Sequence, residues 1–440
     1  MQSNADIYKQ RRQWLMSQLD DNAVVVLVGN KEVTRNKNIN FRFRQDHDFY
    51  YFSGFDQPDA VLVIRPRHEK PFTMFVQPKD EFQEVWFAQR AGVSGAIEQY
   101  GADQAFSVED IDTKLPQLFE ERTDIYWSDE LGRFNDRVFD WLKRQRMGAK
   151  FDEVKRFRHL KSVLPITQNI RRVKDNHEVS LIRNAAKASV EGHKTLMRLA
   201  RPGITEQEMA AAFYKRISEL GCNDVGYPTI LASGHNACCL HYDVNSSTLA
   251  DNELVLVDAG GEYNYYTADI TRTYPVNGRF TSQQKELYQL VLNATDAAIE
   301  GLKPGVSWNS IYPTAMRVLT QGLIDLGILN MSFDQAWQTE AYKSFTLHKT
   351  GHFMGLDVHD VGSYRESNGD WIELEKNMVF TVEPGLYFPN NCLQVNEKWR
   401  GMGVRVEDDI LITDFGHENL SIDAPRTVTE IEQIMQEGDS

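Results

Sequence analysis

The hydrophobic pattern of the chain changes between about Pro165 and Asp175, and the two patterns require different architectures. Before the change, an amphipathic helix is predicted over 7–19. Short β-branched runs, each long enough for one strand, follow at 23–28, 60–64 and 72–76. This alternation predicts an α/β domain. We interpret a polar and aromatic stretch over 45–55 as the edge of a core and a turn rather than as a functional site.

After the change the predicted helices become long. The first covers 176–199, and Asp175 and Glu178 at its start have the spacing of a capping box. A chain of 440 residues also exceeds the usual size of one domain. We therefore predict an α/β (α+β) protein of two domains, which cover 1–170 and 171–440.

The second part contains a weak internal repeat. Residues 201–205 (Arg-Pro-Gly-Ile-Thr) and 303–307 (Lys-Pro-Gly-Val-Ser) each follow a long predicted helix, the second of which covers 281–302. In each copy Pro-Gly precedes a Thr or Ser that can cap another helix, and Gly221 or Gly327 ends that helix. Chance could produce so short an echo. Two similar helix-pair halves around a sheet nevertheless predict a cleft at their junction.

Charge and cysteine usage narrow the classes of function. The 48 basic and 63 acidic residues give a net charge of −15, which opposes binding to phosphate backbones and anionic membranes. The four cysteines have neither the density of a disulfide scaffold nor the spacing of a zinc ribbon, so a reducing compartment fits. No apolar run is long enough to span a bilayer, and the first residues differ from a signal peptide. We expect a cytoplasmic protein that binds neither nucleic acid nor membrane.

Two acidic residues stand on neighbouring predicted strands. The apolar run 254–257 ends at Asp258, and the segment 268–274, which contains Asp269, is predicted to be its hairpin partner. A single acid at a strand end is usually a turn residue. Two acids on paired strands can face each other, and they form the first part of a candidate site.

A cluster of histidines and two further carboxylates extend this candidate. Three of the eleven histidines lie within twelve positions: His348, His352 and His359. Such a cluster, with its glycines and acids, is typical of metal sites and general bases. Glu383 and Glu407 each end an apolar run, where an unpaired carboxylate is costly to bury. For Glu407, a plain ion pair with Arg405 is the alternative.

Four carboxylates and one imidazole can together bind two divalent cations. Bridging carboxylates hold such ions roughly 3.5 Å apart and let them share a hydroxide. Oxygen-rich ligation favours Mn²⁺, although Co²⁺ or Zn²⁺ would also bind. The residues therefore predict a two-metal site, with manganese as the expected ion.

The order of these motifs resembles a known peptidase family. Asp-x10-Asp, His followed seven residues later by His-Asp, Glu-Pro-Gly-Leu-Tyr and Arg-Val-Glu-Asp follow one another as in the "pita-bread" family of aminopeptidase P, prolidase and methionine aminopeptidase. This match begins at about Asn176 and continues to the end of the chain. Residues 51–55 (Tyr-Phe-Ser-Gly-Phe) and 84–87 (Glu-Val-Trp-Phe) also resemble bacterial aminopeptidase P. The resemblance implies an N-terminal α/β domain followed by a pita-bread domain with pseudo-twofold halves.

The resemblance also implies an activity. A family member of this kind releases the first residue of peptides that have proline in the second position. The implied metal ligands are Asp258, Asp269, His352, Glu383 and Glu407. Asp269 and Glu407 would bridge the metals, a hydroxide between the metals would attack the Xaa-Pro bond, and Glu383 would shuttle the proton.

Further roles follow from the same resemblance. His241 and His359 would contact the scissile carbonyl and the proline side of the substrate and stabilise the oxyanion. His348 would also bind substrate, while Arg405 and Tyr387 would order the inner wall.

Two residues bear on assembly and on the loop path. Trp86 would reach the cleft of a neighbouring subunit, because the family forms tetramers, and we therefore expect a homo-oligomer. Lys349 departs from the family, which usually has Gly after the first His of the cluster. This departure bears on the path of the loop near His348 and not on the ligand set.

Two other functions are alternatives. A prolidase shares the chemistry but accepts only dipeptides, and a peptide-binding pita-bread module shares the fold without a complete ligand set. Methionine aminopeptidase normally lacks so large an N-terminal domain. The complete ligand set and the N-terminal match favour aminopeptidase P.

Overall fold

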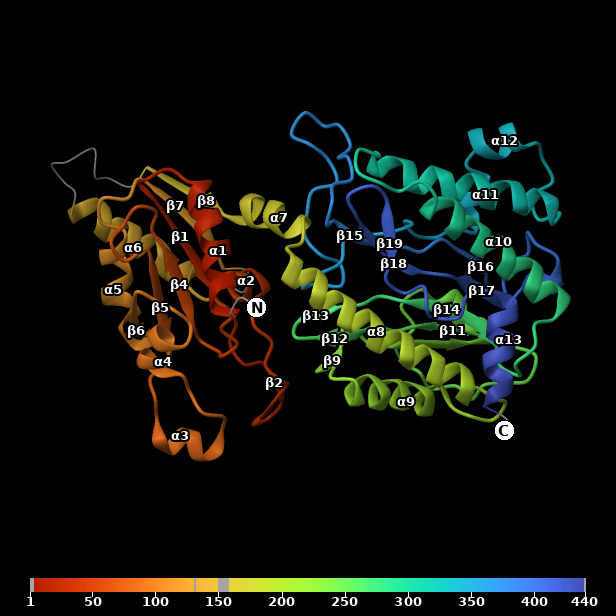
Figure 1. The fold of residues 1–440 in the computed structure, drawn as a ribbon, viewed down its shortest axis with the longest axis horizontal. Helices are drawn as coiled ribbons and strands as arrows, with labels where there is room; N and C mark the ends of the chain where they lie inside the picture. Colours follow the sequence, from red (N-terminus) through yellow and green to blue (C-terminus); the bar gives the residue numbers. More distant parts are fainter. Residues whose placement is uncertain (1–3, 130–131, 149–157, 439–440) are drawn as a thin grey trace. The chain divides into compact units, whose positions relative to one another are not determined.

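The computed structural model describes residues 4–129, 132–148 and 158–438. The chain divides into two compact units, Met1–Gln168 and Asn169–Ser440 (Figure 1). Each unit contains a hydrophobic core of its own. None of the helices within the described ranges combines the length and the apolar character needed to cross a membrane.

The first unit is built on a mixed six-stranded sheet. Its strands, in spatial order, are β6 (Gln104–Ser107), β5 (Phe72–Val76), β4 (Val61–Ile64), β1 (Ala23–Val28), β7 (Asp124–Ser128) and β8 (His159–Ser162). β1, β4 and β5 pair antiparallel, whereas β6, β7 and β8 join in parallel. Every residue of β1, β4 and β5 is buried, which explains why these strands are continuous apolar runs rather than alternating ones.

Helices and a hairpin complete the first unit and confirm the predicted α/β class. They are α1 (Asn4–Ser17), β2 (Thr34–Asn36), β3 (Ile39–Asn40), α2 (His47–Ser53), α3 (Glu81–Trp86), α4 (Gly92–Glu98), η1 (Val108–Asp110), α5 (Ile111–Leu118) and α6 (Asn135–Gly148).

Two segments that were expected to be irregular are helical. The stretch 45–55, interpreted as a core edge and a turn, contains α2, which Asp46 caps at its start and Gly54 ends at a φ of 65°. The predicted boundary near residue 170 contains α7 (Leu164–Arg172). Both helices are too short to show a clear period in the sequence, and helices of this length depend on packing for their stability.

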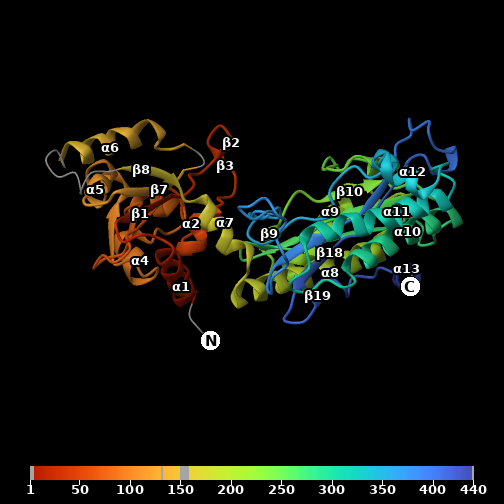
Figure 2. The ribbon, with the colours of Figure 1, turned by 90° about the horizontal axis from the view of Figure 1, so that it is seen from above.

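The second unit contains two pairs of helices. α8 (Asn176–Leu199) packs on α9 (Glu206–Glu219), and α10 (Ser282–Ile299) packs on α11 (Ile311–Asp325). Figure 1 shows the two pairs on opposite sides of the strands. The last helix, α13 (Val428–Glu437), packs against α8 (Figure 2). The predicted repeat is therefore present as two helix pairs.

The caps of these helices explain where they begin. Capping boxes at Asp175, Thr205 and Thr281 start α8, α9 and α10. The expected cap at Ser307 is wrong for α11, because Ser307 precedes a 3₁₀ turn, η4 (Trp308–Ser310), and α11 begins only after that turn.

The strands of the second unit form several short sheets. β10 (Ile230–Ser233), β11 (Leu254–Asp258) and β14 (Thr271–Pro275) form one, and β15 (Val379–Val382), β18 (Asp408–Ile412) and β19 (His417–Asn419) form another. β16 (Gly385–Phe388) pairs with β17 (Met402–Arg405), and β9 (Asp224–Val225), β12 (Gly261–Tyr263) and β13 (Tyr266–Thr267) form a third sheet. The remaining elements are η3 (Gly234–Cys238), α12 (Phe333–Gln338), η5 (Ala341–Ser344) and η6 (Glu397–Trp399).

The registers of these strands bring the acidic motifs together. Asp258 on β11 lies opposite Thr271 on β14. An isolated bridge joins Thr271 to Glu407, just before β18, and β18 pairs with β15, which Glu383 follows. These pairings therefore bring the ends of strands that are far apart in the sequence, and the acidic residues at those ends, close to one another.

Candidate active site

A cavity of about 510 Å³ lies in the second unit. Nine of the predicted site residues line it: His241, Asp258, Asp269, His348, His352, His359, Glu383, Arg405 and Glu407. Two others do not line it. Tyr387 is buried behind the wall, and Trp86 lies on α3 of the first unit, where its side chain is exposed.

The two aspartates face each other, as their strands predict. Asp258 is the last residue of β11, and Asp269 stands two residues before β14, which pairs with β11. The hydroxyl of Tyr227 lies 2.6 Å from one carboxylate oxygen of each aspartate. Tyr227 therefore links the two acids, and sequence reasoning missed it because an aromatic residue in a Gly-Tyr-Pro loop has no distinctive period or charge.

Glu407 is brought next to Asp269 by the isolated bridge between Thr271 of β14 and Glu407. The hydroxyl of Thr271 donates a hydrogen bond of 2.6 Å to Oε2 of Glu407, whose side chain is buried. Asp269, His352 and Glu407 each offer one ligand atom, and these three atoms lie within 4.8 Å of one another. This group has the donor types and the closeness that a metal ion requires.

His352 and Glu383 are held on the wall next to these acids. The Nε2 atom of His352 lies 3.4 Å from Oδ2 of Asp269 and 3.7 Å from Oε1 of Glu383. Backbone hydrogen bonds from Thr381 to the His352 carbonyl and from Glu383 to the Thr350 carbonyl attach this loop to β15. The loop has little regular structure of its own, and its position depends on the neighbouring strand.

The electrostatics of the cavity show an excess of negative charge. Burial raises the pKa of Glu383 to about 7, and burial together with the neighbouring acids raises the pKa of Glu407 well above its usual range. Burial and Asp258 likewise raise the pKa of Asp269. Burial would lower the pKa of His352, but Asp269 and Glu383 raise it to about 9. Divalent cations relieve repulsion of this kind, so the donor set fits divalent metal ions with oxygen-rich ligation.

Arg405 partly balances these acids and orders the wall. Its Nη2 atom lies 2.5 Å from Oδ2 of Asp258, and its Nη1 atom donates to the Tyr387 hydroxyl at 2.8 Å. That hydroxyl lies 2.7 Å from Nε2 of His348, whose Nδ1 lies 3.5 Å from Oε2 of Glu383. Burial and Arg405 lower the pKa of His348 to about 4, so this imidazole is neutral near pH 7. The ion pair considered for Arg405 is therefore made with Asp258.

His359 and His241 reach the open part of the cavity. The ring of His359 meets that of His352 edge to face at a centroid distance of 4.2 Å. Burial and the neighbouring His352 lower the pKa of His359. His241 follows η3 and is exposed in the cavity. Both rings line the cavity, outside the group of three close ligand atoms formed by Asp269, His352 and Glu407.

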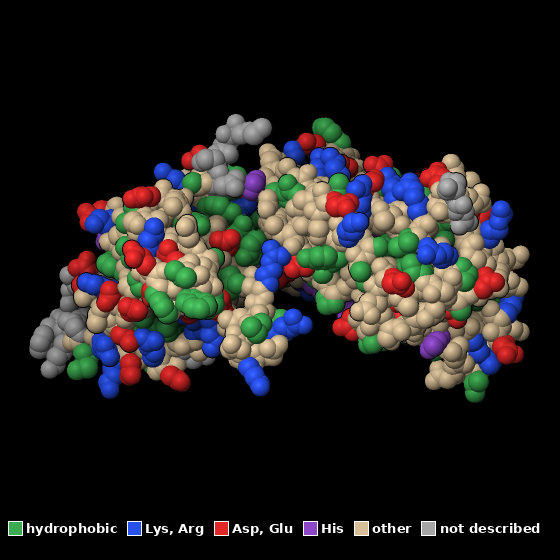
Figure 3. Space-filling model, turned by 90° about the horizontal axis from the view of Figure 1, so that it is seen from below, with side chains coloured by type: hydrophobic (Ala, Val, Ile, Leu, Met, Phe, Trp, Pro, Cys, Tyr) green, Lys and Arg blue, Asp and Glu red, His purple; other side chains and the backbone are tan. Residues whose placement is uncertain are grey.

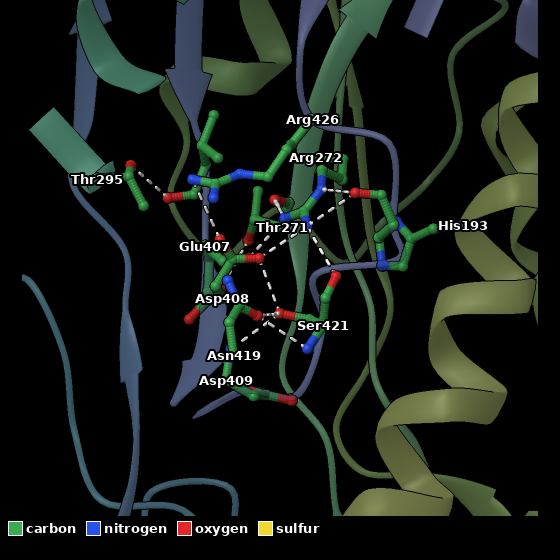
Figure 4. A network of polar contacts seen from close by, with 12 residues as sticks. His193, Thr271, Arg272, Thr295, Glu407, Asp408, Asp409, Asn419, Ser421 and Arg426 are labelled. Carbon is green, nitrogen blue, oxygen red and sulfur yellow. Dashed lines mark hydrogen bonds and ion pairs between the residues drawn. The ribbon is translucent and has the colours of Figure 1, made fainter. Parts of the chain in front are cut away.

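A buried network behind the cavity holds Glu407 in place (Figure 4). The side chain of Arg272 donates a 2.6 Å hydrogen bond to the Glu407 carbonyl and a 2.7 Å bond to Oδ1 of Asp408. Both members of the Arg272–Asp408 pair have side chains with no exposure to solvent. Sequence reasoning missed this pair, although a charged residue between the two β-branched residues Thr271 and Thr273 of β14 was an available signal.

Comparisons with known proteins identify the family of the chain. Residues 180–414 match the family described as metallopeptidase family M24, and residues 8–126 match the aminopeptidase P N-terminal domain. The Xaa-Pro aminopeptidase of Haemophilus influenzae is 35% identical over 429 residues, which cover 97% of this chain and 96% of that protein.

Solved structures are similar over the whole chain. Pseudomonas aeruginosa aminopeptidase PepP has a TM-score of 0.96 at 39% identity, covering 100% of this chain and 99% of that one. A variant of Escherichia coli aminopeptidase P in complex with substrate has a TM-score of 0.94 at 33% identity, covering 100% of both chains. The chain belongs to metallopeptidase family M24, and it carries the N-terminal domain of aminopeptidase P.

Proposed function

We propose that this protein is a metal-dependent Xaa-Pro aminopeptidase, which removes the first residue of peptides with proline in the second position. The observation that carries the proposal is the cavity in which four carboxylates and His352 converge within an M24 fold. The names of its full-length relatives supply the substrate class, and they favour an aminopeptidase over a prolidase or a binding module.

Five residues would hold two divalent cations: Asp258, Asp269, His352, Glu383 and Glu407. When bound, the ions would supply an activated hydroxide near neutral pH and polarise the scissile carbonyl. Hard oxygen donors dominate the set, and for this reason we propose manganese.

Residues around these donors would bind the substrate and move protons. Glu383 borders the cavity and would accept a proton and pass it to the proline nitrogen as the bond breaks. His241 and His359 would donate to the developing oxyanion, a contribution on the order of 3 kcal/mol for each donor. Tyr387 and Arg405 would act indirectly, because they orient His348 and Asp258.

An aromatic wall offers a place for the proline ring. Trp308, Tyr364 and Trp371 line the cavity, and the Trp308 and Tyr364 rings lie 4.8 Å apart. A rigid apolar wall of this kind suits the flat, apolar face of a pyrrolidine ring. We propose that it contributes to the preference for proline.

The α3 helix of the first unit supports a proposal about assembly. Its surface carries four exposed apolar side chains, Phe82, Val85, Trp86 and Phe87. α3 belongs to the face shown in Figure 3, where hydrophobic side chains are visible on the surface. Exposed apolar patches commonly mark protein contacts, and we propose a homo-oligomer, a tetramer by analogy with the family, in which Trp86 lies against another copy.

The four free cysteines suit the reducing conditions of the cytoplasm, where we place the protein.

The test compares three peptides on one preparation of known metal content. We expect rapid cleavage of Ala-Pro-Ala, much slower cleavage of Ala-Ala-Ala, and loss of both activities after chelation, with Mn²⁺ restoring them best. Equal kcat/KM for the two tripeptides would end the proline-specific proposal. Cleavage of the dipeptide Ala-Pro, without cleavage of the tripeptide, would identify a prolidase instead.

A further inference from the structure

The cavity wall carries a positive charge that the proposed reaction does not use. The basic side chains that line the cavity, besides its histidines, belong to Arg405 and Lys349. Arg405 is fully engaged, because its Nε, Nη1 and Nη2 atoms contact Thr271, Tyr387 and Asp258. Lys349 is therefore the basic side chain of this wall that a ligand could meet.

The surroundings of Lys349 leave its ammonium group available. Its Nζ atom lies 5.5 Å from the centroid of the Tyr312 ring, in the first turn of α11. Within the described residues this ammonium group forms no hydrogen bond or ion pair, and the side chain is exposed. A cation above an aromatic ring in water is only weakly stabilised, so the contact orients the ammonium group without neutralising it.

Lys349 joins the acidic group and the Tyr312 side of the cavity lining. His348, the preceding residue, has its Nδ1 atom 3.5 Å from Oε2 of Glu383. The four-carbon stem of Lys349 ends with its Nζ atom 5.5 Å from the centroid of the Tyr312 ring, and both side chains line the cavity. An extended peptide advances about 3.3–3.6 Å per residue, so the third residue lies roughly 7 Å beyond the first. The side chain of Lys349 has a length comparable to this separation between the first and third residues.

We propose that Lys349 forms a carboxylate-binding subsite for the third residue of the substrate, an inference that rests on the proposed aminopeptidase function. The amino end of the peptide would lie at the carboxylates that line the cavity. A carboxylate at the third residue would pair with the Lys349 ammonium group. The shared ligand chemistry is a carboxylate, which either the C-terminus of a tripeptide or an acidic third side chain can supply. Short peptides that carry a free carboxylate at the third residue should therefore be the favoured substrates.

The experiment measures kcat/KM for two matched pairs of peptides. The first pair is Ala-Pro-Ala and its C-terminal amide, and the second is Ala-Pro-Glu-amide and Ala-Pro-Gln-amide. We expect the wild type to favour the carboxylate member by about three- to tenfold, a range typical of one partly exposed ion pair. Preference within the first pair alone identifies the C-terminus as the ligand, and preference within the second pair alone identifies the side chain. Added NaCl should reduce either ratio toward one.

Substitutions then assign the preference to this residue. Lys349→Met should bring the ratio of the two kcat/KM values to one by slowing cleavage of the carboxylate member alone. Lys349→Glu should reverse the preference. Lys343→Met removes the same charge from an amine that pairs with Glu340 and does not line the cavity, so it should keep the wild-type ratio.

Two results overturn the proposal, and they differ from each other. If all four peptides are cleaved but Lys349→Met keeps the wild-type ratio, the subsite is wrong while the aminopeptidase function stands. If the wild type with restored metal cleaves none of the four, the proposed function fails and the subsite fails with it.

Discussion

At the scale of single residues, His352 and His359 differ in what surrounds them. His352 lies between two carboxylates, with its Nε2 atom 3.4 Å from Asp269 and 3.7 Å from Glu383. His359 meets the ring of His352 and the open cavity. On the proposed function, the first imidazole would hold a cation, and the second would donate to charge that develops on the substrate.

Substitution should separate these two roles. We expect His352→Ala to lose bound metal and kcat together, because it removes a ligand. We expect His359→Ala to keep its metal while kcat/KM falls about 10²-fold or more, because a donor to the oxyanion is lost. The measurement is bound metal per folded protein, combined with single-turnover rates. If His359→Ala loses metal as completely as His352→Ala, the division of roles is wrong.

The residues of the site could be predicted to different degrees. Asp258, Glu383 and Glu407 stand at ends of apolar runs, where a carboxylate is conspicuous in the sequence. Tyr227 gave no such signal, because only the fold shows that its hydroxyl lies 2.6 Å from both aspartates. Contacts made by loop residues across distant strands depend on the register of those strands, and one sequence does not reveal that register.

At the scale of elements, a buried charge cluster attaches the loop that carries His359 to the last turn of α7 and to the segment that follows it. The carboxylate of Asp360 lies 2.5 Å from Nη2 of Arg171 and 2.7 Å from Nζ of Lys174. The side chains of these three residues are almost completely buried. Burial alone would raise the pKa of Asp360, but Lys174 and Arg171 hold it below its usual value of 3.8.

We expect Asp360→Asn to destabilise the protein by about 3–5 kcal/mol at neutral pH, because it removes the carboxylate that contacts both the buried Lys174 ammonium group and the buried Arg171 guanidinium group, and Arg171 keeps its contact with Asp357. A carboxylate whose folded pKa is depressed stabilises the protein above its unfolded pKa, near 3.8, and this contribution is lost as pH falls through the lower folded value. The difference in free energy of unfolding between wild type and variant should therefore be constant above about pH 5 and shrink below pH 3.8. Urea unfolding at a series of pH values measures this difference.

Asp357→Asn is the matched control for this experiment. Asp357 also contacts Arg171, at 2.6 Å, but its side chain is 39% exposed, so solvent screens the pair. We expect Asp357→Asn to lower the free energy of unfolding by less than about 1 kcal/mol. An equal cost for both variants would show that the buried position of Asp360 has no special effect.

The elements themselves could be predicted where local signals were strong. The helix over 176–199 was predicted from its period and capping box, and the structure places α8 over the same residues. The start of α11 was predicted at Ser307, yet three residues of 3₁₀ helix intervene. A Ser after Pro-Gly can begin either kind of turn, and packing of Trp308 against Phe353 and Tyr364 distinguishes them only in the folded protein.

At the scale of the whole molecule, the two units should respond differently to metal. The donors all lie in the second unit, whereas the first unit has a separate core. An ion that binds only the folded state stabilises it by about 2.7 kcal/mol when its free concentration is 100 times Kd. We expect Mn²⁺ to slow hydrogen exchange in β11, β14 and β18 by up to about 100-fold relative to chelated protein, and to leave β1, β4 and β7 unchanged. Equal slowing in both units, measured by mass spectrometry of their peptides, would contradict a site confined to the second.

The apolar surface of α3 bears on how copies of the chain associate. The Trp86 side chain is 71% exposed on α3, next to the exposed Phe82, Val85 and Phe87, an arrangement that is costly to leave in water. If another copy covers it, Trp86→Ala should weaken association by about 2 kcal/mol or more and lower activity without lowering metal content. Phe139→Ala is the control, because this aromatic side chain is 69% exposed on α6, away from α3 in sequence. Sedimentation velocity over a range of concentrations, with activity assayed in the same samples, measures both effects. A wild-type monomer with full activity would show that the α3 surface serves another purpose, whereas a joint loss of association and activity in the Trp86 variant alone would show that one copy completes the site of the next.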